Sequence, residues 1–134
     1  MPVLQRKDEQ RVTGRDGDVL LAFGLAPAPA NRRLYITDEN QENTYSAAVG
    51  DDGSFTDVKL FAEIGGESVA EDVEGNVYIA AGQIYVYNPS GERIGTIEVP
   101  ERPSQILFGG ADRKTLFIAA RSSLYAVQMR NAGH

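Results

Sequence analysis

The segment Val77-Tyr-Ile-Ala-Ala81 has two near copies in this chain, Leu34-Tyr-Ile-Thr-Asp38 and Leu116-Phe-Ile-Ala-Ala120. The starts of the three segments are separated by 43 and 39 residues. Each segment is apolar and contains β-branched and aromatic residues, which is typical of a strand buried on both faces. Because regular repeats of this length indicate a modular architecture, the chain is predicted to contain three copies of one unit.

Further strands are predicted on both sides of each copy. In the second unit the apolar run Ser68-Val-Ala70 and the polar turn Val73-Glu-Gly-Asn76 come before it. The alternating segment Ile84-Tyr-Val-Tyr87 and a fourth strand within 93–99 come after it. Alternation indicates a strand whose two faces have different surroundings. One unit is therefore predicted to form four antiparallel strands, which at this repeat length is typical of a β-propeller blade.

The chain is thus predicted to be all-β, a β-propeller segment of about three four-stranded blades within residues 18–134. The predicted blades cover residues 18–63, 64–102 and 103–134. Residues 1–17 are polar and are predicted to form an irregular lead or an edge strand. The third unit ends after its third strand, and we consider Val3-Leu4 or Arg11-Val12-Thr13 as strands that could complete it.

Three blades leave two flanks of the segment without a neighbouring blade. A propeller closes with about four to eight blades, and each flank is apolar because it is normally buried against the next blade. We therefore expect either a homodimer of two three-bladed halves or the remainder of a longer propeller to cover these flanks.

The composition narrows the classes of function. The 134 residues are 42% hydrophobic, and the formal net charge is −6 with no clustered basic stripe, so nucleic acid is not expected as a partner. The absence of cysteine excludes disulfides and thiolate chemistry. The single histidine, His134, is the last residue, so a Ser-His-Asp triad is not expected. No signal peptide and no membrane span are expected, so the chain is expected to be soluble, but the sequence indicates no compartment.

A series of motifs occurs in one order along the second and third units. Glu67-Ser-Val-Ala-Glu-Asp72 precedes the second copy of the repeated strand, and Asn88-Pro-Ser-Gly91 follows it. Leu107-Phe-Gly-Gly110 and Ser122-Ser-Leu-Tyr-Ala126 lie on either side of the third copy. In this order and at this spacing the motifs resemble the C-terminal half of the SMP-30/gluconolactonase/LRE-like family of sugar lactone lactonases.

The resemblance implies a function as well as a fold. Members of this family are six-bladed propellers, so this chain would be half of one. They commonly hydrolyse lactones with Ca²⁺ or another divalent cation at the mouth of the central channel. The chain is therefore predicted to be a lactonase-like, divalent-metal-dependent hydrolase module acting on a small-molecule lactone, complete only as a dimer or within a longer chain.

The resemblance also indicates site residues. One family ligand lies just before an inner strand, and that position is Glu67 in the second unit, which becomes the candidate metal ligand and catalytic base. The same position is assigned to Gln105 in the third unit and to Phe23, which cannot coordinate a metal, in the first.

Asp38 is the third candidate metal ligand, at the start of a loop rich in oxygen ligands, Asp38-Glu-Asn-Gln-Glu-Asn43. The loop lacks the glycine and the glutamate of an EF-hand, so a solvated turn is the alternative interpretation. The loss of the family's amide ligand at Phe23 favours a second hypothesis for the whole chain, a non-catalytic propeller used for binding or as a scaffold.

Overall fold

The computed structural model describes residues 33–38, 40 and 42–133, together with the backbone of three short strands among the first 28 residues. Phe23 and His134 lie outside the described residues. The described part contains strands and turns but no helix, and therefore no helix that could cross a membrane. The all-β prediction is confirmed.

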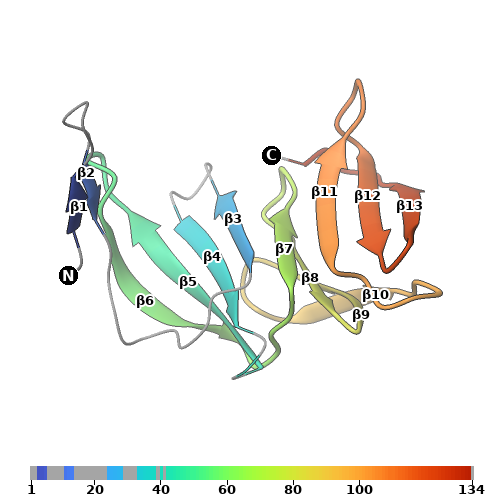
Figure 1. Cartoon of the computed structure of the whole chain (residues 1–134), viewed down its shortest axis with the longest axis horizontal. Helices are drawn as coiled ribbons and strands as arrows, with labels where there is room; N and C mark the ends of the chain where they lie inside the picture. The colour runs from blue at the N-terminus through green and yellow to red at the C-terminus, as the bar shows by residue number, and fades with distance from the viewer. Residues whose placement is uncertain are drawn as a thin grey trace.

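Three antiparallel sheets follow one another along the chain (Figure 1). Blade 1 contains β3 (Gly24–Ala28), β4 (Arg33–Asp38), β5 (Asn43–Val49) and β6 (Phe55–Ala62). Blade 2 contains β7 (Ser68–Glu71), β8 (Val77–Ala81), β9 (Gln83–Tyr87) and β10 (Arg93–Ile97). Blade 3 contains β11 (Gln105–Gly109), β12 (Thr115–Ala120) and β13 (Ser123–Gln128). Each predicted unit thus contains one sheet.

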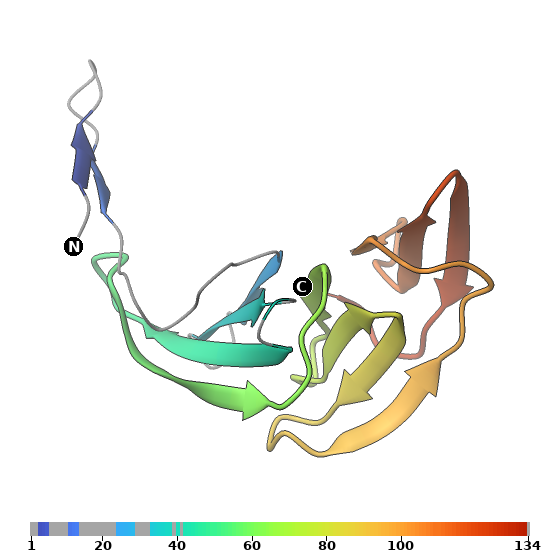
Figure 2. The ribbon, with the colours of Figure 1, turned by 60° about the horizontal axis from the view of Figure 1, so that its bottom comes forward.

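The sheets are arranged as neighbouring propeller blades. In each sheet the strands are hydrogen-bonded in chain order, from an inner strand outward. The inner strands β3 and β11 both contact the inner strand β7, so the sheets radiate from a common side (Figure 2). This arrangement confirms the prediction of a propeller segment.

Two apolar cores hold the blades together, one between each pair of neighbours. Strand alternation sends Val77 and Ile79 of β8 toward blade 1, where they pack with Tyr35. The intervening residues of the same strand, Tyr78 and Ala80, face blade 3. Because both faces of blade 2 are buried in this way, its central strand is apolar at every position.

Blade 3 has no fourth strand among the described residues. The segments considered for this role, β1 (Val3–Gln5) and β2 (Arg11–Thr13), pair only with each other in the described structure. Their hairpin stands beyond blade 1, at the opposite end of the molecule from β13 in both views (Figures 1 and 2). Within one chain, therefore, neither segment completes blade 3.

The residues after β13 run back to blade 2 instead. The backbone N–H of Val73 donates to the carbonyl of Ala132 at 2.8 Å, and Gly133 donates to Arg113 at 2.9 Å. The side-chain amide of Asn131 donates to Glu74 at 3.0 Å. This C-terminal segment, residues 129–133, thus joins the turn after β7 to the turn after β11.

Candidate functional site

The short connection from β6 to β7 determines where Glu67 lies. Gly65 and Gly66 pass so close to the backbone of both neighbouring blades that a side chain would not fit: a Cβ on Gly65 would lie 2.0 Å from the carbonyl oxygen of Asp38, and one on Gly66 would lie 1.9 Å from that of Ala80. The N–H of Gly66 donates to the Thr37 hydroxyl at 2.7 Å. The start of β7 is therefore held in a fixed position beside the end of β4.

Glu67 is the first residue after this connection and lies at the end of the sheet where β7 begins. Its N–H donates to the carbonyl of Ala80 at 2.9 Å, which fixes the backbone. Its side chain is 27% exposed and forms an ion pair with Arg102, with 3.6 Å between Oε1 and Nε. A partly exposed carboxylate and a guanidinium thus lie together at this end of the inner strands.

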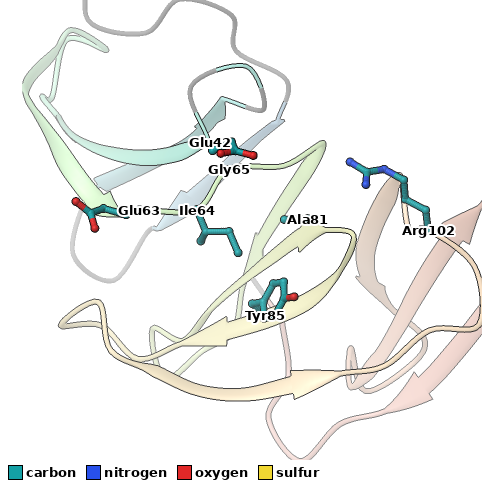
Figure 3. Close-up of a pocket in the computed structure, with 7 residues that line it drawn as sticks. All are labelled: Glu42, Glu63, Ile64, Gly65, Ala81, Tyr85 and Arg102. Atoms are coloured by element: carbon teal, nitrogen blue, oxygen red, sulfur yellow. The ribbon is translucent and has the colours of Figure 1, made fainter.

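Arg102 also lines a cavity of about 380 Å³ (Figure 3). The cavity lies over the end of blade 2, and its other lining residues come from the loop after β4, from the connection between β6 and β7, and from strands β8 and β9. They are Glu42, Glu63, Ile64, Gly65, Ala81 and Tyr85. Its volume is within the range of roughly 300–1,000 Å³ that is usual for small-molecule sites, and the lining combines an aromatic ring with groups that can donate and accept hydrogen bonds.

Asp38 lies at the same end of the sheets but is fully buried, with 0% of the residue exposed. Its carbonyl oxygen is next to Gly65, two residues before Glu67. The structure therefore brings Asp38 and Glu67, two of the three candidate ligands, into one region. It does so with the Asp38 residue inside the protein rather than at the surface.

To locate Gln105, the third candidate, we first compare equivalent positions in blades 2 and 3. Ile79 of β8 faces blade 1, and Ile118 of β12 faces blade 2, so the two residues occupy equivalent places in their blades. Each is followed by an alanine, Ala80 in blade 2 and Ala119 in blade 3.

These alanines show which residue of blade 3 corresponds to Glu67. Just as the N–H of Glu67 donates to Ala80, the N–H of Ser104 donates to Ala119 at 2.8 Å. The register therefore places Ser104 in the position that the sequence assigned to Gln105. Gln105 itself is the first residue of β11, pairs with Ala119 and is exposed.

The described residues do not form a complete metal site. No group of three or more Asp, Glu, His or Cys side chains comes together among them. Glu67 offers an accessible carboxylate, the kind of ligand that Ca²⁺ prefers, but a cation is already beside it in the form of Arg102. A divalent ion at Glu67 would therefore need donors other than a cluster of such side chains within the described residues.

A second polar cluster lies at the opposite end of β7. Asp72 is fully buried and accepts hydrogen bonds from the Tyr78 hydroxyl at 2.9 Å and from the Asn76 amide at 3.0 Å. Burial, together with the charge of Asp72, raises the pKa of the neighbouring Glu71 to about 7 and also raises the pKa of Tyr78. These residues hold the turn after β7, so the cluster supports the fold at the end remote from Glu67.

The fold and the site together define a class of protein. Inner strands that gather side by side, each followed outward by antiparallel partners, are the arrangement of a β-propeller segment. Arg102 lines the cavity, whereas Glu67 is not among the lining residues and lies beside Arg102.

Comparison with known proteins identifies the family. Residues 3–122 match the model of the SMP-30/gluconolactonase/LRE-like region, and the chain belongs to this family. A 6-deoxy-6-sulfogluconolactonase from Pseudomonas putida is 30% identical over 122 residues, which cover 84% of this chain and 42% of the relative. The resemblance seen in the sequence is confirmed.

Solved structures show the same fold. A putative gluconolactonase superposes with a TM-score of 0.83 at 19% identity, covering 98% of this chain and 46% of the other. A gluconolactonase from Xanthomonas campestris gives 0.78 at 23% identity, with 92% and 42% covered. A calcium-binding regucalcin from Agrobacterium tumefaciens gives 0.76 at 17% identity, with 87% and 48% covered. The chain spans about half the length of these proteins.

Arg102 is the residue of this region that sequence reasoning missed. It lies 35 positions from Glu67 in the sequence, in a loop between Pro100 and Pro103. No local motif identifies it as a partner of Glu67. The position of an arginine just before a predicted inner strand was the available signal, because such positions gather at one end of the propeller.

Proposed function

We propose that this chain is a lactonase module whose reaction takes place where Glu67 and Arg102 lie. The proposal is supported by the family and by the 30% identical relative, a 6-deoxy-6-sulfogluconolactonase. The single observation on which it depends is the Glu67–Arg102 pair beside the 380 Å³ cavity. A six-carbon sugar lactone, with or without an anionic substituent, is the substrate class that we propose.

The two side chains suit the chemistry of lactone hydrolysis. A water molecule attacks the lactone carbonyl, and the Glu67 carboxylate takes its proton as general base. The Arg102 guanidinium donates hydrogen bonds to the oxyanion that forms on the carbonyl oxygen. When the bond between the carbonyl carbon and the ring oxygen breaks, Glu67 returns the proton to that oxygen, and the product is the open hydroxy acid.

A divalent cation is a separate part of this proposal, because the described residues of the three blades do not form a complete metal site. The family and the calcium-binding relative support a divalent ion such as Ca²⁺. Of the three candidate ligands, Glu67 offers a partly exposed carboxylate, whereas Asp38 is fully buried and Gln105 does not occupy the position of Glu67. The ion pair between Arg102 and Glu67 means that a metal would compete with a guanidinium for this carboxylate. Ca²⁺-dependent thermal stabilisation that is lost in Glu67→Ala would support a site here.

The proposal is tested by measuring acid release from a six-carbon sugar lactone at constant pH. We expect Glu67→Gln to lower kcat/KM by about 100-fold or more, and Arg102→Gln by about 100-fold, because each removes a group that acts in the transition state. Glu92→Gln, which changes an exposed carboxylate in the turn between β9 and β10, is the matched control and should leave the rate unchanged.

Two outcomes would contradict the proposal. Equal rates for the wild type and Glu67→Gln would remove Glu67 from the reaction. A folded chain that hydrolyses no lactone with or without Ca²⁺, Mn²⁺ or Zn²⁺ would favour the non-catalytic binding or scaffold hypothesis.

A further inference from the structure

Blade 3 has a continuous apolar surface on the side away from blade 2. Leu107 of β11 pairs with Phe117 of β12, which pairs with Ala126 of β13, and Ala119 pairs with Leu124 in the next row. These five residues form what we call the open flank. Leu107 is 64% exposed and Leu124 is 72% exposed, although both are large and apolar.

Blade 2 has a flank with the same arrangement, and that flank is covered. Its rows consist of Ala70, Tyr78 and Val86, and of Ala80 and Ile84, joined by the same strand pairing. All five residues pack against blade 3 in one core, and Ile84, the counterpart of Leu124, is 0% exposed. Equivalent positions that are apolar in both blades indicate that the open flank, too, is built to receive the near side of another blade.

Blade 1 has residues of the matching kind on its far side. Leu34 and Ile36 of β4 alternate with Tyr35, which faces blade 2, so they lie on the face away from it. They correspond to Val77 and Ile79, the residues with which blade 2 packs against blade 1. Ile36 is only 8% exposed, and Leu34 is half-buried, so the far side of blade 1 carries apolar residues of the kind that the open flank would contact.

We propose that a second copy of this chain covers the open flank, with its blade 1 packed on blade 3 as blade 3 packs on blade 2. The relatives support a ring of twice this length, because the chain superposes on 46% and 42% of two of them. Since blade 3 of the second copy then meets blade 1 of the first, both contacts form around one two-fold axis and the ring closes. The described residues do not form a complete metal site at the inner strands, and in the ring this site gains a second set of inner strands across the channel.

This interface does not depend on the lactonase proposal, because its tests measure mass and proximity rather than activity. Sedimentation or light scattering should give twice the chain mass of 14.5 kDa at micromolar concentration. Leu124→Asp places a charge in the contact and should weaken the dimer at least tenfold. Ile94→Asp changes a residue that is 57% exposed on the outer strand β10 and should leave the mass unchanged. A wild-type mass of one chain would overturn the proposal.

A second experiment tests which flanks meet. The chain has no cysteine, so Leu34→Cys and Leu107→Cys each introduce a single thiol. With a short bismaleimide, a mixture of the two variants should give a cross-linked pair, whereas Leu107→Cys alone should not. Equally fast cross-linking of Leu107→Cys alone would mean that open flanks meet each other, and would overturn the head-to-tail contact.

Discussion

The covered flank of blade 2 and the open flank of blade 3 have the same strand pairing and the same apolar character, but different surroundings. Ile84 and Leu124 occupy equivalent places in the two flanks, and their exposures are 0% and 72%. The difference shows that in this fold burial is decided by the neighbouring blade and not by the blade itself. A single blade is a sheet with two apolar faces, and its stability depends on the blades that cover them.

The largest expected effect separates these two residues directly. Ile84→Ala should lower the free energy of unfolding by about 2–5 kcal/mol, because it leaves a cavity in a packed core. Leu124→Ala should cost less than about 0.5 kcal/mol in dilute protein, because the side chain is solvated there. Urea denaturation at two protein concentrations measures both. Equal losses would contradict the comparison, whereas a Leu124→Ala cost that grows with concentration would support the second copy.

The next effect concerns the C-terminal segment that joins blade 3 to blade 2. A Cβ on Gly133 would lie 2.1 Å from Cγ of Phe108, so Gly133→Ala has to displace the ring or the segment. We expect a loss of about 1–3 kcal/mol in urea denaturation. Gly95→Ala is the control, since a Cβ on Gly95 of β10 meets nothing within 4 Å. A neutral Gly133→Ala would show that the segment adds nothing to the contact.

The third effect is pH-dependent and arises in β7. Burial, assisted by the charge of Asp72, raises the pKa of Glu71 to about 7, above its ordinary value of 4.5. Between these two values the folded chain holds a proton that the unfolded chain has lost, so stability should fall as the pH rises through this window and level off above it. At pH 8 the ionised Glu71 should lower the free energy of unfolding by an amount on the order of 1–2 kcal/mol, and Glu71→Gln should abolish this pH-dependent loss. Melting temperatures of both proteins at pH 5 and pH 8 test this, and parallel pH profiles would contradict it.

The smallest effect is expected at Asn131, which tethers the C-terminal segment through its side chain. Its amide donates to Glu74 at 3.0 Å and to Asp72 at 3.3 Å. Asn131→Ala should cost about 1 kcal/mol, because Asp72 keeps its bonds from Tyr78 and Asn76. Asn131→Asp should cost more, since it puts a further carboxylate beside Asp72 and Glu74. An Asn131→Asp protein as stable as the wild type would contradict this account of the tether.

Much of the fold could be predicted because each blade repeats one pattern. The apolar strand at Val77–Ala81 is buried on both faces, as its composition indicates. Leu116–Ala120 has the same composition, but in the described structure Phe117 and Ala119 are only partly buried because they lie on the open flank. The motif Asn88-Pro-Ser-Gly91 forms a turn, as its proline and glycine favour, and Gly91 adopts a φ of +89° there. The pairing of β1 with β2 was not predicted, because these short segments lack the apolar pattern of the repeated strand.

The site was only partly predictable, for a reason of register. Counting back along the repeat leads from Glu67 to Gln105, but the hydrogen bonds lead to Ser104. Nine residues lie between the paired Val69 and Ile79, whereas eleven lie between the paired Ile106 and Ile118. A hairpin that is longer by two residues shifts the inner strand relative to its partner, and the sequence does not show on which strand the extra residues fall. The contact between Arg102 and Glu67 depends on the folding of two separate connections, so no local motif could reveal it.

The path of the C-terminal segment has a practical consequence for handling this protein. Because residues 129–133 cross to the turn after β7, they end at the far side of the sheets from Glu67 and the cavity. A purification tag or fluorescent fusion attached at the C-terminal end of this segment would consequently leave the face with Glu67 and the cavity clear. It would lie on the opposite face, beside the turn after β7, where it could report on assembly.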